Sequence, residues 1–408
     1  MIRFNKKLYY KYFDLYRLSS FLKDTIEVNR SQKVMKIVKE ADKMGLDLSD
    51  WDQLFHLNID NLTKEEIILF KETNSIPLID RYYSKVEDWI KYIILPDFFD
   101  IDFLSEIFST NNIRTRKDLI SFFSNKSFKE LYGTENAELY CHYVEHSDWC
   151  SFPIKYARRY SEHDSLDKKY KGISIKGNFH NHTIYSDGIY SIKELMDIAI
   201  SNNYEYIGIS DHTQVMSGIS DDSISEQHDK IDSLNKCSTC RILKSAECEI
   251  LNNGDLDLNN DSLSKLDYTI IAIHKQINQV KRIAEQRLIK AIENPYSNIL
   301  AHPSGRLYKR KVGMCVDMYK IIDACIANGV AVEINGDPDR LDLDPKYINY
   351  ALNKGAMFTL DSDTHLANSI YNINNATKIA YDYHISAERC LNTMGLSELK
   401  TFFSKNNV

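Results

Sequence analysis

Two histidines separated by one residue, His180 and His182, are followed five residues later by Asp187 and then by Gly188. Side chains alternate along a strand, so the two histidines would point the same way and could hold one cation. Asp187, beyond a short turn, could reach a second cation nearby. Such a pair also occurs as a strand end with surface histidines, so its meaning depends on the rest of the chain.

The elements that would position these residues alternate in the βα manner from Gly177 onward. Helices are predicted over 191–202 and around 316–328. Seven strands are predicted, one ending at His180 and the others over 206–210, 241–246, 268–273, 297–301, 330–334 and 357–360. We expect the α/β class, with a closed parallel barrel in this part of the chain.

Histidines and acids follow nearly every predicted strand, and six of the twelve histidines stand at these positions. In chain order the residues are His180, His182, Asp187, Asp211, His212, Glu247, His274, His302, Glu333, Asn335, Asp361, Asp363 and His365. In a βα barrel the carboxyl ends of the strands converge on one face. The sequence therefore predicts one polar site there, since chance placement would scatter these residues.

Mixed histidine and carboxylate ligands suit zinc, manganese or iron better than magnesium or calcium alone. A carboxylate such as Glu247 could bridge two cations. Clustered cations hold a shared water as hydroxide at neutral pH and neutralise phosphate oxygens during in-line attack. Hydrolysis of a phosphoester is the chemistry that this residue set favours.

Four motifs, at 179–183, 210–212, 301–303 and 362–365, resemble those of the PHP (polymerase and histidinol phosphatase) domain, above all the C-terminal PHP domain of bacterial family X DNA polymerases. The resemblance covers about residues 175–400 and implies a distorted (βα)7 barrel with three divalent metal ions (Mn, Zn or Fe). It implies three ligand sets: His180, His182, Glu247 and Asp363; Glu247, His274 and His302; and Asp187, His212 and His365.

Two arginines near the same face, Arg306 and Arg340, could clamp a phosphate in bidentate fashion, although either could be a surface arginine. Lys275, directly after His274, could contact phosphate or cap its strand. Asp211 is expected to orient His212 or its loop and not to bind metal.

Residues 1–150 are predicted to form an all-α domain, with apolar residues at helical spacing and helices over 64–72, 78–94, 103–110 and 116–123. An irregular linker is expected over 151–172, and the barrel domain over 173–408. Segments at 70–78 and 112–119 resemble the helix-hairpin-helix region of bacterial family X polymerases. Of the turns that would meet phosphate, only the one at Gly133 keeps a glycine, so duplex binding and a structural or partner-binding role both stay open.

The composition and charge of the chain argue against some classes of protein. The formal net charge of −7 argues against a surface that coats nucleic acid, and no apolar run long enough to span a membrane is present. We expect a cytoplasmic protein with reduced cysteines. The short linker leaves no room for a polymerase palm, so polymerase activity is not expected.

Three functions follow as hypotheses. The first is a metal-dependent phosphoesterase, using water activated by a trinuclear metal site on nucleic-acid ends (single strands or 3′ ends), as a 3′-5′ exonuclease or 3′-phosphatase. The second is a small-molecule phosphomonoesterase of the histidinol-phosphatase type, acting on a small phosphorylated substrate. The third is a regulatory, partner-binding protein, which the complete ligand set argues against.

Overall fold

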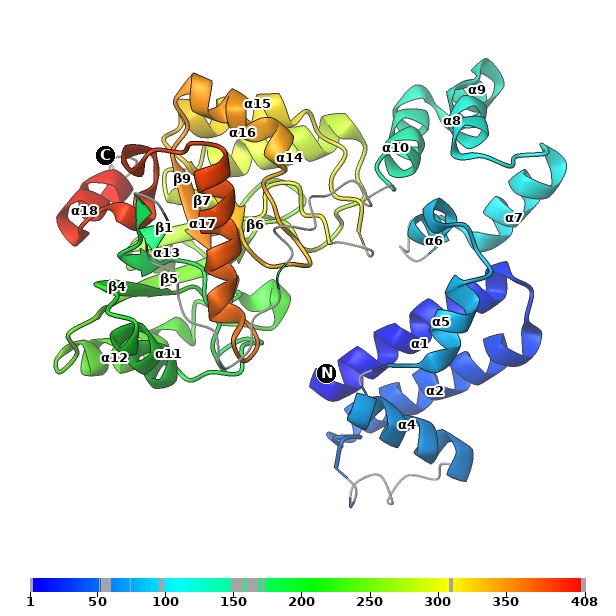
Figure 1. Ribbon diagram of the computed structural model, residues 1–408, viewed down its shortest axis with the longest axis horizontal. Helices are drawn as coiled ribbons and strands as arrows, with labels where there is room; N and C mark the ends of the chain where they lie inside the picture. The colour runs from blue at the N-terminus through cyan, green and yellow to red at the C-terminus, as the bar shows by residue number, and fades with distance from the viewer. Residues whose placement is uncertain are drawn as a thin grey trace. The chain divides into compact units, whose positions relative to one another are not determined.

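The computed structural model describes residues 3–50, 52, 60–73, 75–94, 99–147, 158, 169–170, 173–307 and 311–404. The chain divides into two compact units, Met1–Cys150 and Ser151–Val408 (Figure 1). Each unit buries its own set of apolar side chains, so each has a separate core.

The first unit is helical throughout its described residues. Its helices are α1 (Arg3–Phe21), α2 (Thr25–Lys43), α4 (Asn61–Thr73), α5 (Pro77–Tyr83), α6 (Asp88–Ile94), α7 (Ile101–Thr110), α8 (Arg116–Ser124), α9 (Lys126–Tyr132) and α10 (Thr134–Glu145). Leu8, Tyr12 and Leu15, spaced for one helix face, are buried on α1. Thr115 and Asp118 form a capping box that begins α8.

One predicted helix of this unit, over 78–94, is wrong as a single element, because the chain forms α5 and α6 with a break at 84–87. Ser84 closes α5 by donating from its hydroxyl to the carbonyl of Arg81, at 2.8 Å. The turn that follows buries Val86 in the core, which a continuous helix would not require.

The predicted linker and the glycine-free turns at 57–61 and 95–100 fall mostly outside the described residues. Gly133 is described, and it separates α9 from α10 with a φ of +85°. Glycine adopts this conformation without strain, whereas other residues rarely do.

The second unit holds seven parallel strands whose order in the sheet follows the chain, which confirms the predicted α/β barrel (Figure 1). The strands are β3 (Gly177–Asn178), β4 (Tyr206–Ile209), β5 (Arg241–Glu249), β6 (Tyr268–Ala272), β7 (Ser297–Leu300), β8 (Ala331–Asn335) and β9 (Phe358–Asp361). A two-stranded antiparallel ribbon, β1 (Lys169–Tyr170) with β2 (Ile173–Ser174), precedes them.

The barrel is nearly closed beyond the carboxyl ends of β3 and β9. The amide of His182 donates to the carbonyl of Thr364 at 2.9 Å, and the amide of Thr364 donates to the carbonyl of His180 at 3.3 Å. The closing contacts therefore fall among the residues for which a metal site is predicted.

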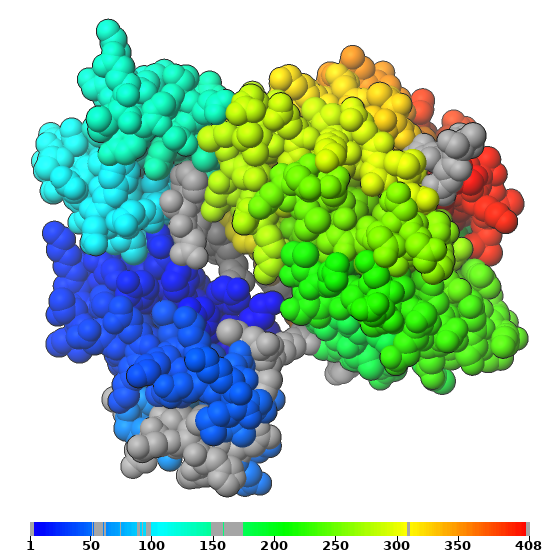
Figure 2. Space-filling model, turned by 180° about the vertical axis from the view of Figure 1, so that it is seen from behind, coloured from blue at the N-terminus to red at the C-terminus, as the bar shows by residue number. Residues whose placement is uncertain are grey.

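Helices lie around the strands of the second unit, and their apolar faces pack on them (Figure 1). They are α11 (Ile192–Ser201), α12 (Ile224–Asn235), α13 (Asn260–Leu263), α14 (Lys281–Ile292), α15 (Met318–Ala327), α16 (Pro345–Lys354), α17 (Ile373–Asp382) and α18 (Leu396–Ser404). From behind, the green to yellow segments of this unit form one closely packed surface (Figure 2). No helix among the described residues is long and apolar enough to cross a membrane.

Candidate metal centre

All nine residues predicted as metal ligands lie beyond or near the carboxyl end of a barrel strand, and the structure brings all nine together. Their ligand atoms form four groups within which every atom lies within 4.8 Å of the others. The groups are His182, Asp187, His212 and His365; His180, His182 and Asp363; His180, Glu247 and His302; and His212, Glu247 and His274. The shared members make these groups one continuous cluster.

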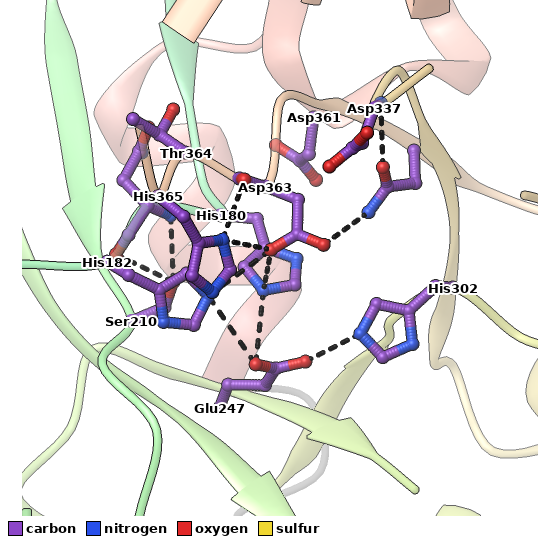
Figure 3. A network of polar contacts seen from close by, with 12 residues as sticks. His180, His182, Ser210, Glu247, His302, Asp337, Asp361, Asp363, Thr364 and His365 are labelled. Carbon is purple, nitrogen blue, oxygen red and sulfur yellow. Dashed lines mark hydrogen bonds and ion pairs between the residues drawn. The ribbon is translucent and has the colours of Figure 1, made fainter. Parts of the chain in front are cut away.

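Glu247, two residues before the end of β5, belongs to two of these groups. Its Oε1 is 2.8 Å from His302 Nε2, and its Oε2 is 2.8 Å from His212 Nδ1. Figure 3 shows Glu247 and Asp363 extending toward the rings of His180, His182 and His365. Because its two oxygens face different histidines, Glu247 can serve two neighbouring cation positions.

Several buried polar atoms at the centre lie near other polar atoms but make no hydrogen bond of acceptable geometry within the described part of the chain. They are His180 Nε2, both ring nitrogens of His182, His212 Nδ1, Glu247 Oε2, His274 Nε2, His302 Nδ1 and Asp363 Oδ1. A buried polar atom without a partner is costly. So many in one place are accounted for if each of these residues offers one atom to a bound cation, and the residues present fit such ions.

Three histidines are oriented through Nδ1, which leaves Nε2 for the cluster. His180 Nδ1 donates to Glu333 Oε1 at 2.6 Å, and His274 Nδ1 donates to Glu249 Oε2 at 2.8 Å. His365 Nδ1 lies 2.9 Å from the carbonyl oxygen of Asp363.

Sequence reasoning missed the role of Glu249 and gave none to Glu333. Glu249 follows Glu247 by two residues on β5, so both side chains point to the same side of the sheet. That spacing is the signal that could have identified it. Arg287 of α14 lies 3.6 Å from Glu249, and the amides of His274 and Lys275 donate to the same carboxylate.

The histidines of the centre differ in the direction in which their pKa values are shifted. Burial lowers the pKa of His274 to about 3 and that of His302 to about 4, so both are neutral at pH 7, the form that binds a metal. Burial would also lower the pKa of His180, but the carboxylates of Glu333, Asp363 and Glu247 outweigh it and raise that pKa well above its usual value. Burial likewise raises the pKa of Glu333 to about 7, despite the opposing effect of His180.

The two arginines lie in different surroundings. Arg340 Nε donates to Asp363 Oδ2 at 2.8 Å, beside the cluster. Arg306 is buried, and its nitrogens donate to the carbonyls of Arg340 and Leu341 and to Asp344. Its role as a phosphate clamp stays a prediction, but these contacts give it a structural part in holding the loop after β8.

Asp211 confirms the expectation that it orients a loop. Its carboxylate accepts from the amide and hydroxyl of Thr183, from the hydroxyl of Ser186 and from the amide of Gln227, at 2.6–2.7 Å. Lys275 is exposed, and only its backbone amide contacts the centre, through Glu249.

Comparison with known proteins gives relatives of two kinds. A stretch of 237 residues, 57% of this chain, is 32% identical to the DNA polymerase/3'-5' exonuclease PolX of Bacillus subtilis, of whose length it covers 42%. The chain thus spans less than half of that relative. It is also 27% identical over 229 residues to the probable phosphatase TTE1963 of Caldanaerobacter subterraneus, covering 85% of it, and 25% identical to a probable phosphatase of Acetivibrio thermocellus, covering 89%.

No protein-family model matches the chain. Among solved structures, the histidinol phosphate phosphatase of Lactococcus lactis, complexed with zinc, L-histidinol and phosphate, matches at 15% identity and a TM-score of 0.38, over 51% of this chain and 93% of that one. The second unit of the chain is therefore similar in sequence to proteins named as probable phosphatases, and it carries a clustered set of residues that could hold metal ions.

Proposed function

We propose that this protein is a metal-dependent phosphoesterase of the PHP type that acts on nucleic-acid ends, as a 3′-5′ exonuclease or 3′-phosphatase. The observation that carries the proposal is the single, largely buried cluster of nine histidine and carboxylate residues, seven of which have a buried side-chain atom without a hydrogen bond. The choice of nucleic acid rests on the similarity to a polymerase and exonuclease, which is the strongest in sequence identity among the relatives described above.

Three divalent ions (manganese, zinc or iron) are proposed to occupy the cluster in the three ligand sets implied by the PHP resemblance. Bound there, they would supply Lewis-acid polarisation of phosphate oxygens and a nucleophile at neutral pH. Glu333 and Glu249 hold His180 and His274 in the orientation that ligation needs.

Side chains at the open side of the cluster are proposed to contact the substrate. In hydrolysis the oxygen of water forms a bond to phosphorus, the ester P–O bond breaks, and the leaving oxygen takes up a proton. Arg340 can contact a phosphate oxygen while it holds Asp363, because its guanidinium carries donors beyond the Nε that this contact uses. Asp187 and His365 are the most exposed of the predicted ligands, so substrate would meet them first.

A two-substrate assay tests this proposal. With Mn²⁺ present, the wild-type protein should shorten 5′-labelled single-stranded DNA, and His180→Ala and Asp363→Ala should abolish turnover while circular dichroism shows an unchanged fold. Full activity in either variant would contradict the proposal that metal ions bound by these residues are needed for hydrolysis.

The small-molecule phosphatase remains the second candidate, because the named phosphatases match along most of their length. Turnover of 4-nitrophenyl phosphate without any shortening of DNA would favour it over the nuclease.

A further inference from the structure

Large apolar side chains are exposed at six positions in the described part of the second unit, and four of these lie on three loops that are hydrogen-bonded to one another. Ile184 (63% exposed), Ile189 (37%), Val215 (38%) and Leu366 (45%) belong to the loops that follow β3, β4 and β9. The other two, Tyr319 and Leu396, lie on α15 and α18. Clustered exposed apolar residues are a mark of a binding surface, whereas single ones are not.

These four residues, here called the apolar rim, flank the ligands of one group in the metal centre. Ile184 and Ile189 lie on either side of Asp187, Val215 follows His212 by three residues, and Leu366 directly follows His365. The ligand atoms of Asp187, His212 and His365 lie within 4.8 Å of one another. The rim therefore lies at the mouth of this group, beside its most exposed members.

The loops that carry the rim are tied to one another, so its side chains are held in place. The amide of Ile189 donates to the carbonyl of His365 at 3.1 Å. Asp211, on the loop after β4, accepts from Thr183 and Ser186 on the loop after β3. Close packing adds to this, because a Cβ on Gly218 would lie 1.7 Å from the carbonyl oxygen of His212.

We propose that the apolar rim binds the terminal nucleoside of a substrate whose phosphate lies at the neighbouring ligand group. This inference rests on the proposed function and specifies which part of the substrate the barrel recognises. A nucleotide joins an anionic phosphate to a flat ring with apolar faces, and the mouth offers cation-binding atoms next to rigid apolar side chains. A small polar ester would reach the same phosphate position without gaining contact from the rim.

The test uses two phosphodiesters that release the same 4-nitrophenolate: the 4-nitrophenyl ester of thymidine 5′-monophosphate and methyl 4-nitrophenyl phosphate. The two esters differ only in the group on the phosphate, which is thymidine in one and methyl in the other. The ratio of their kcat/KM values therefore measures recognition of the nucleoside. Wild type should prefer the thymidine ester, and Ile184→Ser and Leu366→Ser should each lower the ratio about 10-fold, mainly through KM. Leu396→Ser, a matched exposed leucine on α18, should leave the ratio unchanged.

Two results would overturn the proposal: a wild-type ratio near one, or a ratio that the rim variants do not change. Hydrolysis of neither ester is a different outcome: it would contradict the exonuclease form of the proposed function and leave the 3′-phosphatase form, which acts on monoesters. In that event, the affinities of the protein for thymidine 3′-monophosphate and for inorganic phosphate are compared by equilibrium binding, in wild type and in the rim variants. If the rim variants bind thymidine 3′-monophosphate more weakly and inorganic phosphate as wild type does, the proposal is supported. If wild type binds both ligands with equal affinity, the proposal is excluded.

Discussion

At the scale of residues, the candidate metal centre depends on carboxylates that hold histidines as much as on the ligands themselves. Glu333 shows this most clearly, because one of its oxygens accepts from His180 Nδ1 and the other accepts from the amide of His302. Asp363 divides its oxygens in a similar way. Oδ2 is held by Arg340 and Asn335, and Oδ1 is left without a hydrogen bond inside the cluster.

Replacing Glu333 with Gln tests this support. The amide keeps one acceptor but loses the charge that favours a Nδ1–H on His180, so metal affinity should fall roughly 10- to 100-fold. Competition with a chromogenic chelator measures this directly. Glu293→Gln, an exposed position after α14, is the control and should bind metal like wild type. Unchanged affinity in Glu333→Gln would show that His180 needs no such partner.

Arg340→Ala tests the proposed phosphate contact. Removing a charged donor from a reacting phosphate should lower kcat by about 10²-fold at saturating Mn²⁺. Steady-state assays on the substrate that wild type hydrolyses measure this, with Arg282→Ala on α14 as a control away from the centre. A kcat within error of wild type would assign Arg340 only to the anchoring of Asp363.

Because strand ends converge in a barrel, the sequence predicted that polar residues far apart in the chain would meet, and the resemblance to the PHP domain selected nine of them as ligands. It did not predict which arginine faces the centre. Arg306 and Arg340 both follow barrel strands, but only the three-dimensional path of the loop after β8 places Arg306 against backbone carbonyls. The break between α5 and α6 was missed because residues 78–94 keep helical spacing while Val86 turns into the core.

At the scale of elements, short loops after the strands fix the ligands, and glycines allow those loops to pack closely. A Cβ on Gly188 would lie 2.2 Å from the carbonyl oxygen of His182, and one on Gly218 would lie 1.7 Å from that of His212. Real Cβ atoms do not approach backbone so closely, so any side chain there must displace a predicted ligand.

Gly218→Ala should therefore move His212, reduce the metal bound at its group, and lower stability by about 1–3 kcal/mol through forced backbone shifts. Thermal unfolding and metal titration of the same sample measure both effects. Gly395→Ala is the matched control, because its new Cβ would meet only flexible side-chain ends, the nearer at 3.5 Å. Equal behaviour of the two variants would contradict a tight loop at His212.

At the scale of the whole molecule, the chemistry belongs to the second unit, which holds all nine predicted ligands, both arginines and the apolar rim. The helical unit carries none of them, and its likeness to a helix-hairpin-helix region stays a prediction, as do the linker over 151–172 and any contact with DNA. In the described part of that unit, Gly133 between α9 and α10 is the feature that fits the resemblance.

The metal content of the purified wild-type protein tests the central claim most directly. After removal of metal with a chelator, incubation with Mn²⁺ or Zn²⁺ and gel filtration, elemental analysis should find about three ions per chain. The same analysis of Asp363→Ala should find fewer. A folded wild-type protein that retains no metal would contradict the account, because the unpaired histidine and carboxylate atoms at the strand ends would then need another explanation.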